Sequence, residues 1–112
     1  MESNVNKRLY GMLGFAMRAG KLVIGTEPVC KACAKVGNQK PRLVLIAHTA
    51  SDGTKKKLIT KAEFYGISAV IVDIDSSELG RLLGKLYAPA TVAIIDDRFA
   101  EEIRLALEGG ST

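Results

Sequence analysis

The chain has 112 residues, of which 47% are hydrophobic, and its 16 lysines and arginines against 12 aspartates and glutamates give a net charge of +4. This size predicts a single domain over 1–112 with a flexible tail at 109–112. Its apolar runs reach only about five residues, far short of the ~20 that cross a bilayer, and the N-terminus has no apolar signal core. We therefore expect a cytoplasmic, monomeric protein with no membrane partner.

The basic residues are concentrated in the first half of the chain. Residues 1–61 contain 12 basic and 3 acidic residues, a net charge of +9, whereas residues 62–112 contain 4 basic and 9 acidic residues, a net charge of −5. A one-sided basic surface on a small domain is typical of nucleic-acid binding, because lysines neutralise phosphates and release counterions. Charge alone leaves open the alternative that folding mixes the two halves into a solvated, mottled surface.

Helical patterns alternate with short, wholly apolar segments along the chain. In order, the first half predicts a helix carrying Val5, Leu9, Leu13 and Ala16 that stops at Gly20, a strand at 22–24, a helix carrying Val29, Cys33 and Val36, and a strand at 43–47. The second half predicts a helix carrying Leu58, Ala62 and Tyr65 that stops at Gly66, a strand at 69–72, a helix carrying Leu79, Leu82, Leu83 and Leu86, a strand at 91–95, and a helix carrying Phe99, Ile103 and Leu107 that ends at 109–110. Continuous apolarity is typical of strands covered on both faces, so the pattern predicts an α/β fold, a three-layer α-β-α sandwich with a four-stranded mixed sheet.

Ligands of such sheets bind in the loops beyond the strand ends, and the first of these loops leads into a helix. It runs through Gly25, Thr26, Glu27 and Pro28, and Lys31 and Lys35 follow at four-residue steps. Thr26 is the expected N-cap, and the helix start can offer backbone N–H groups and lysines to phosphates. The alternative, favoured for this loop taken alone, is a capped helix with an ordinary Glu–Lys pair worth only ~0.2–0.5 kcal/mol.

The loop after the second strand precedes an unusual helix start. Ser51 to Thr54 should cap this helix, yet Lys55, Lys56 and Lys57 fill its first turn. Cations at this position oppose the helix dipole by ~0.3–1 kcal/mol each, and a local rule broken without visible compensation points to function. Phosphate contact is therefore favoured over a solvated lysine run offset by Asp52. His48, at the strand end, is expected to contact phosphate or base, or to bond within the loop.

Two cysteines three residues apart raise a redox alternative. Cys30 and Cys33 form a CxxC pattern after a strand, and Pro89 sits where a thioredoxin-like fold places its special proline. However, Cys30 lies about four residues into the predicted helix, and Cys33 lies on its apolar face, as structural cysteines do. A zinc site lacks a ligand because His48 is the only histidine. Carboxylates gather at predicted helix starts, where capping explains them, so we expect no metal, no cofactor and no enzymatic activity.

Several segments together resemble a known family. They are 13–21, Gly25 with Lys31 and Ala32, the strand 43–47, 54–57, Tyr65, Leu79-Gly80 with Gly84, and 92–95. Their order and spacing, from about Lys7 to Leu107, resemble the kink-turn RNA-binding ribosomal-protein superfamily of the L-seven-Ae and L-thirty-e type, and within it the small bacterial branch often called YlxQ proteins.

The resemblance implies an α-β-α sandwich that binds structured RNA, in association with the ribosome, and catalyses no reaction. In the family, the loop and helix start after the first strand read sheared G·A pairs, which corresponds here to Gly25, Thr26, Glu27, Pro28 and Lys31. A second, more apolar loop packs on an extruded base, which corresponds to 74–76 with 88–90. The family places Asn-Glu or Lys-Gln where this chain has Glu27-Pro28, and proline offers no polar side chain to a guanine edge, so kink-turn specificity stays open.

From these arguments we expect an RNA-binding protein whose partner is ribosomal or other structured RNA. The expected RNA-binding residues are Gly25, Thr26, Glu27, Lys31, Lys35, Arg42, His48, Lys55, Lys56, Lys57, Ile74, Ser76, Ala88 and Pro89, with Arg18 and Lys21 as outer contributors. Two alternatives remain: a thioredoxin-like redox protein that uses Cys30 and Cys33, and a protein-interaction module whose acidic C-terminal half meets a basic partner.

Overall fold

A computed structural model describes residues 4–109 of the chain. Its elements are α1 (Asn4–Arg18), β1 (Leu22–Ile24), α2 (Thr26–Cys33), the short 3₁₀ helix η1 (Gly37–Gln39), β2 (Leu43–Ala47), α3 (Asp52–Phe64), β3 (Ser68–Val72), α4 (Ser76–Leu82), β4 (Thr91–Ile94) and α5 (Asp97–Gly109). All predicted helices and strands are present in the predicted order. Of the expected tail, 109 closes α5 and 110–112 lie outside the described residues.

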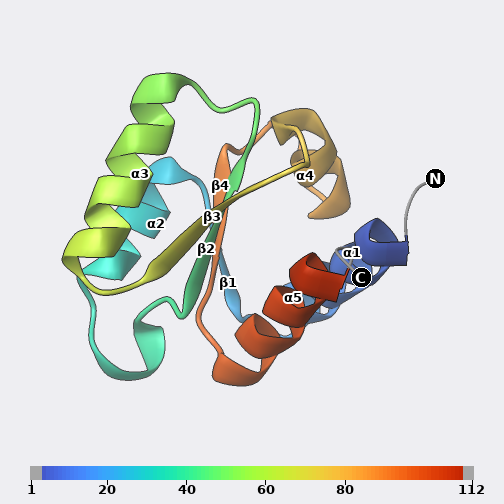
Figure 1. Ribbon diagram of the computed structural model, residues 1–112, viewed down its shortest axis with the longest axis horizontal. Coiled ribbons are helices and arrows are strands. Elements are labelled where there is room, and N and C mark those ends of the chain that lie inside the picture. Colours follow the sequence, from blue (N-terminus) through green and yellow to red (C-terminus); the bar gives the residue numbers. More distant parts are fainter. Residues whose placement is uncertain (1–3, 110–112) are drawn as a thin grey trace.

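The four strands form one mixed sheet in the order β1-β4-β2-β3. β2 and β3 are parallel, while β4 runs antiparallel to both of its neighbours. Figure 1 shows α2 and α3 on one side of this sheet and α1, α4 and α5 on the other. The architecture is therefore the predicted three-layer α-β-α sandwich with a four-stranded mixed sheet. Across residues 4–109, no helix combines the length and apolarity required to span a membrane.

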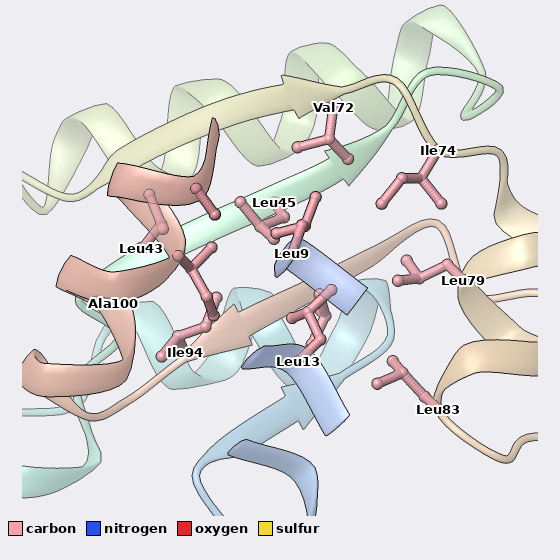
Figure 2. Close-up of a cluster of buried hydrophobic side chains, with 13 residues drawn as sticks. Leu9, Leu13, Leu43, Leu45, Val72, Ile74, Leu79, Leu83, Ile94 and Ala100 are labelled. Carbon is pink, nitrogen blue, oxygen red and sulfur yellow. The ribbon is translucent and has the colours of Figure 1, made fainter. Parts of the chain in front are cut away.

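The central strand β2 explains why its sequence is apolar without alternation. Leu43 and Leu45 belong to the core under α1, α4 and α5, where Figure 2 shows Leu45 beside Leu9. Val44 and Ile46 belong to the second core, under α2 and α3. Because successive side chains of a strand point to opposite faces and both faces are covered, every residue of β2 must be apolar.

The sheet topology brings several helix starts to one end. β1, β2 and β3 run in the same direction, so their C-terminal ends, and the N-terminal end of β4, lie together. We call this the helix-start edge: it comprises the loops 48–51 and 73–75, the starts of α2, α3 and α4, and the loop 83–90 before β4. The opposite edge holds 19–21, 34–42, 65–67 and 95–96. Every predicted site residue can be assigned to one of these two edges or to a helix between them.

Two helices are shorter than the sequence predicts. α4 ends at Leu82, and Gly84 (φ 71°) turns the chain away, so Leu86, which the pattern places on the helix's apolar face, is fully exposed. A glycine in the left-handed conformation after the last turn is a strong helix stop, and it is closed here by the Lys85 N–H donating to the Gly80 carbonyl at 2.8 Å. Likewise α2 ends at Cys33 and leaves Val36 exposed. Both predictions were wrong because helical spacing continues by chance past the stop.

Candidate nucleic-acid interface

The start of α2 is open to an anion. Its N-cap is Gly25, with φ 106° and ψ 153°, and no side chain caps the helix. The predicted cap, Thr26, is instead the first helical residue, because the required positive φ suits glycine and strains threonine. Pro28 fits the first turn, where its missing N–H costs nothing. The N–H groups of Thr26 and Glu27 therefore face the helix-start edge without a capping side chain, which is the geometry that binds phosphate.

Glu27 does not stand alone at this helix start. Its carboxylate accepts a hydrogen bond from the Lys57 ammonium, with 3.0 Å between Oε2 and Nζ, and this pair joins α2 to α3. Lys57 holds the pKa of Glu27 below its usual value, chiefly through that hydrogen bond, and Glu27 raises the pKa of Lys57 in return. Lys31 and Lys61 lower the pKa of Glu27 further. The carboxylate that would repel phosphates is thus balanced by surrounding lysines.

The start of α3 carries the cap that the sequence predicts. Ser51 Oγ accepts from the Thr54 N–H at 3.1 Å and donates to Thr54 Oγ1 at 3.0 Å. α3 begins at Asp52, so its first turn carries this acidic residue and ends at Lys55, which is partly buried. Lys56 and Lys57 are exposed and begin the second turn, so the prediction that all three lysines fill the first turn was wrong. Neither Lys55 nor Lys56 forms an ion pair with another residue in 4–109. The Ser51 side chain caps the helix, and the ammonium groups of Lys55 and Lys56 remain available to an anionic partner.

The remaining loops of the helix-start edge are tied to one another. Ser76 donates its N–H to Thr49 Oγ1 at 2.9 Å, and the Ala47 N–H donates to the Ala90 carbonyl at 2.8 Å. His48 is exposed, and its Nε2 lies 3.9 Å from Oδ1 of Asp73. Asp75 caps α4 by accepting from the Glu78 N–H, which confirms capping as the role of this carboxylate. His48, Ser76 and the residues before β4 therefore share an edge with α2 and α3.

Four predicted site residues are placed differently from the expectation. Arg42 lies at the opposite edge, where its Nε donates to Asp97 and its Nη1 to the carbonyls of Gly37 and Lys40. Lys35 follows the C-terminal end of α2, away from the helix starts. The side chain of Ile74 is in the core, 2% exposed (Figure 2), and Pro89 is buried. Arg18 and Lys21, the expected outer contributors, also precede β1 at the opposite edge.

Sequence reasoning missed the two large side chains most exposed at this edge. Leu86 and Tyr87 stand out from the loop between α4 and β4, and Ala88 beside them is exposed. Gly84 was the available signal, since a helix stop at this position releases both residues from the core. The apolar loop expected from the family resemblance is present, but its exposed surface comes from Leu86 and Tyr87 rather than from Ile74.

The two faces of the sheet differ in how folding distributes the charges of the basic and acidic halves of the chain. The layer of α2 and α3 contains 5 basic and 3 acidic residues. On the other side the halves mix, because α1 packs on the acidic α5 and Arg8 pairs with Glu102 at 3.5 Å. The mottled surface considered above is therefore found on the α1–α5 side, while the α2–α3 side stays basic.

The cysteines belong to the core. Cys30 and Cys33 are buried and unlinked, and they pack with Val29, Ile46 and Leu58. Burial raises the pKa of Cys33, which disfavours the thiolate that redox chemistry needs. Within residues 4–109, no three histidine, cysteine or acidic side chains come together as a metal site. The thioredoxin-like alternative is not favoured.

The fold and this edge define a class: small α-β-α sandwich proteins whose basic side chains and helix starts gather beside an exposed apolar loop. Residues 7–104 match the ribosomal protein L7Ae/L30e/S12e/Gadd45 family. The chain belongs to this family, as its sequence motifs predict.

Individual relatives show which branch of the family the chain resembles. The chain is 32% identical over 110 residues to the RNA-binding protein YlxQ of Enterococcus faecium (97% of this chain, 100% of the relative) and 35% identical over 94 residues to that of Bacillus subtilis strain 168 (84% and 89%). It is 32% identical over 91 residues to the large ribosomal subunit protein eL30 of Sulfurisphaera tokodaii (79% and 83%). These similarities confirm the YlxQ-like branch of the family.

Solved structures share the fold. A protein of unknown function from Bacillus halodurans C superimposes with a TM-score of 0.80 at 31% identity, covering 90% of this chain and 97% of that chain. The Giardia lamblia 15.5kD RNA binding protein gives a TM-score of 0.71 at 18% identity, covering 97% and 89%. The second likeness concerns the fold alone.

Proposed function

We propose that this protein binds structured RNA through its helix-start edge and catalyses no reaction. The observation that carries the proposal is the joining, at one edge, of the uncapped start of α2 with the unpaired lysines at the start of α3. A phosphate at this edge meets backbone N–H groups, a helix dipole and mobile cations together. Relatives in the same family are named as RNA-binding and ribosomal proteins, which supports RNA as the anion.

The proposed contacts divide between phosphates and bases. The N–H groups of Thr26 and Glu27, with Lys31, Lys55 and Lys56, bind phosphates. The Glu27 carboxylate, held in place by Lys57 through Oε2, accepts from a guanine edge. Leu86 and Tyr87, together with Ala88, pack on an unstacked base, as apolar and aromatic side chains do in RNA recognition. His48 and Ser76 lie at the border of this surface.

We further propose that the target is ribosomal RNA and that the protein works as a monomer in the cytoplasm. The support is its similarity to a protein named as part of the large ribosomal subunit. Crosslinking in cells followed by identification of the bound RNA tests the target directly.

The affinity for RNA is expected to fall steeply with salt. If about four phosphates are neutralised, binding of a kink-turn hairpin weakens about 100-fold between about 50 and 200 mM salt, because each contact releases condensed counterions. Fluorescence anisotropy across a salt series measures the slope. A straight duplex of equal length is the control for kink recognition, and a slope near zero on both RNAs would rule out phosphate-driven binding.

Glu27 is expected to read guanine. Removing its charge in Glu27→Gln should weaken binding to a kink-turn hairpin by roughly 5- to 100-fold, the range for one well-formed base contact. The matched probe carries inosine, which lacks the guanine amino group, at the guanines of the kink. The wild type should bind the inosine RNA more weakly than the guanine RNA. Glu27→Gln should bind the two RNAs with nearly equal affinity. If Glu27→Gln instead binds both RNAs more tightly, the carboxylate serves only to restrain Lys57.

A further inference from the structure

The outer face of α3 carries a groove that the helix-start edge does not explain. It is lined, along one face of the helix, by Gly53, Lys56, Lys57, Thr60, Lys61, Phe64 and Tyr65. Phe64 is 79% exposed, and its ring meets that of Tyr65 edge-on, with centroids 4.9 Å apart and planes at 85°. Folding buries large aromatic side chains. Single exposed apolar side chains are common on protein surfaces, but Phe64 lines a groove together with lysines, and this combination points to a binding role.

The charge of the groove selects the kind of partner. Three lysines line it and no carboxylate does. Glu27 lies beside the groove, where it pairs with Lys57 and where Lys61 also lowers its pKa. Glu63 lies on the same helix but outside the lining. A basic track that ends in an exposed aromatic ring is the arrangement that holds single-stranded nucleic acid, with phosphates on the lysines and a base on the ring.

The groove also continues from the proposed site. Lys56 is the fifth residue of α3, one turn from the helix-start edge, and Phe64 ends the same helix. The eleven steps from Gly53 to Phe64 span about 16 Å at ~1.5 Å per residue. A strand that leaves the helix-start edge can follow this track for several nucleotides, and the Glu27 carboxylate beside the track is paired with Lys57.

We propose that the outer face of α3 is a second RNA-contact surface that holds a single-stranded segment flanking the structured RNA, with a base stacked on Phe64. The segment's phosphates lie along Lys56, Lys57 and Lys61. This inference rests on the proposed function, because the structured part of the RNA is held at the helix-start edge. It extends the footprint of that RNA to a helix face remote from Leu86 and Tyr87.

The test compares a blunt kink-turn hairpin, the same hairpin with a single-stranded extension at either end, and the isolated single strand. The wild type should bind one extended hairpin more tightly than the blunt one, and Phe64→Ala should remove that gain, by roughly 5- to 150-fold for one stacked base. Phe64→Trp should restore it. Lys61→Ala should flatten the salt dependence on the extended hairpin only, by about 0.7 in slope.

The matched control is Leu105→Ala, which removes an exposed apolar side chain from α5 on the other side of the sheet. It should change binding to none of the three RNAs. The proposal is overturned if neither extension adds affinity, if Phe64→Ala weakens blunt and extended hairpins equally, or if Phe64→Ala changes only self-association in sedimentation. Failure of the blunt hairpin to bind contradicts the proposed function instead, and loss of single-strand binding in Phe64→Ala then still supports this surface.

Discussion

Replacing Lys31, Lys55 and Lys56 together by alanine is expected to lower the affinity for a blunt kink-turn hairpin on the order of 100-fold at about 0.1 M salt. Each lost phosphate contact removes about 0.7–0.9 from the slope of log affinity against log salt, which is a factor of roughly five or more at this concentration. Lys57 is kept so that its ion pair with Glu27 stays intact. Anisotropy titrations over a salt series measure both the loss and the change in slope.

The matched control removes the same charge from the opposite edge. Lys21, Lys40 and Arg98 lie before β1, before β2 and at the start of α5. Their joint replacement by alanine changes the net charge equally but leaves the helix-start edge unaltered. We expect the control to bind with a slope close to that of the wild type. Equal losses in the two variants would mean that net charge, not the helix-start edge, attracts the RNA.

Gly80→Ala is expected to destabilise the protein and displace the apolar loop. A Cβ at this position of α4 would lie 2.3 Å from the Tyr87 carbonyl oxygen and 3.1 Å from Cδ of Pro89, so the backbone of the loop must move. Such overpacking costs about 1–3 kcal/mol, which outweighs the ~1 kcal/mol that alanine gains over glycine in a helix. Because Leu86 and Tyr87 move with the loop, RNA affinity should fall as well.

Chemical denaturation measures the stability of Gly80→Ala, and amide chemical shifts around Tyr87 report the displacement. Gly11→Ala is the control, because it lies in the exposed part of α1 and a Cβ there meets nothing within 4 Å. It should be neutral or slightly stabilising. A Gly80→Ala protein as stable as the wild type, with unshifted amides at residues 86–90, would contradict the close packing of α4 on this loop.

Local sequence patterns predicted the elements and their layers. Gly66 was the expected helix stop, and it lies at φ 73° with the Ile67 N–H bonded back to the Ala62 carbonyl. Ser51 was part of the expected cap and accepts the predicted kind of hydrogen bond. These features depend on residues within a few positions of each other, so the sequence contains all the information they need. Helix lengths were less predictable, because Val36 and Leu86 continue the apolar spacing of α2 and α4 beyond the residues at which these helices end.

The sequence predicted which loops form the candidate site, but not which side chains those loops expose there. Loops after parallel strands meet at one edge whatever their sequence, so Thr26, Glu27, Lys55 and Ser76 could be grouped in advance. Arg42 could have been excluded by the same rule, because it precedes a strand that had been placed correctly, and residues before such a strand lie at the opposite edge. Its assignment to the opposite edge follows from the strand's direction and from Asp97, a partner 55 residues away. Leu86 was missed for a different reason, because its exposure depends on the direction that the chain takes after α4.

By itself, the sequence determined that this chain is an α-β-α sandwich of the L7Ae/L30e/S12e/Gadd45 family with a basic first half. Periodicity and glycine stops act over a few residues, and family motifs retain their order. Only the tertiary structure decided that the α2–α3 side of the sheet stays basic while α1 packs on the acidic α5, that Lys57 balances Glu27 across 30 residues, and that Phe64 faces solvent. These outcomes depend on the strand order β1-β4-β2-β3, which sets which distant side chains meet and which surfaces remain uncovered.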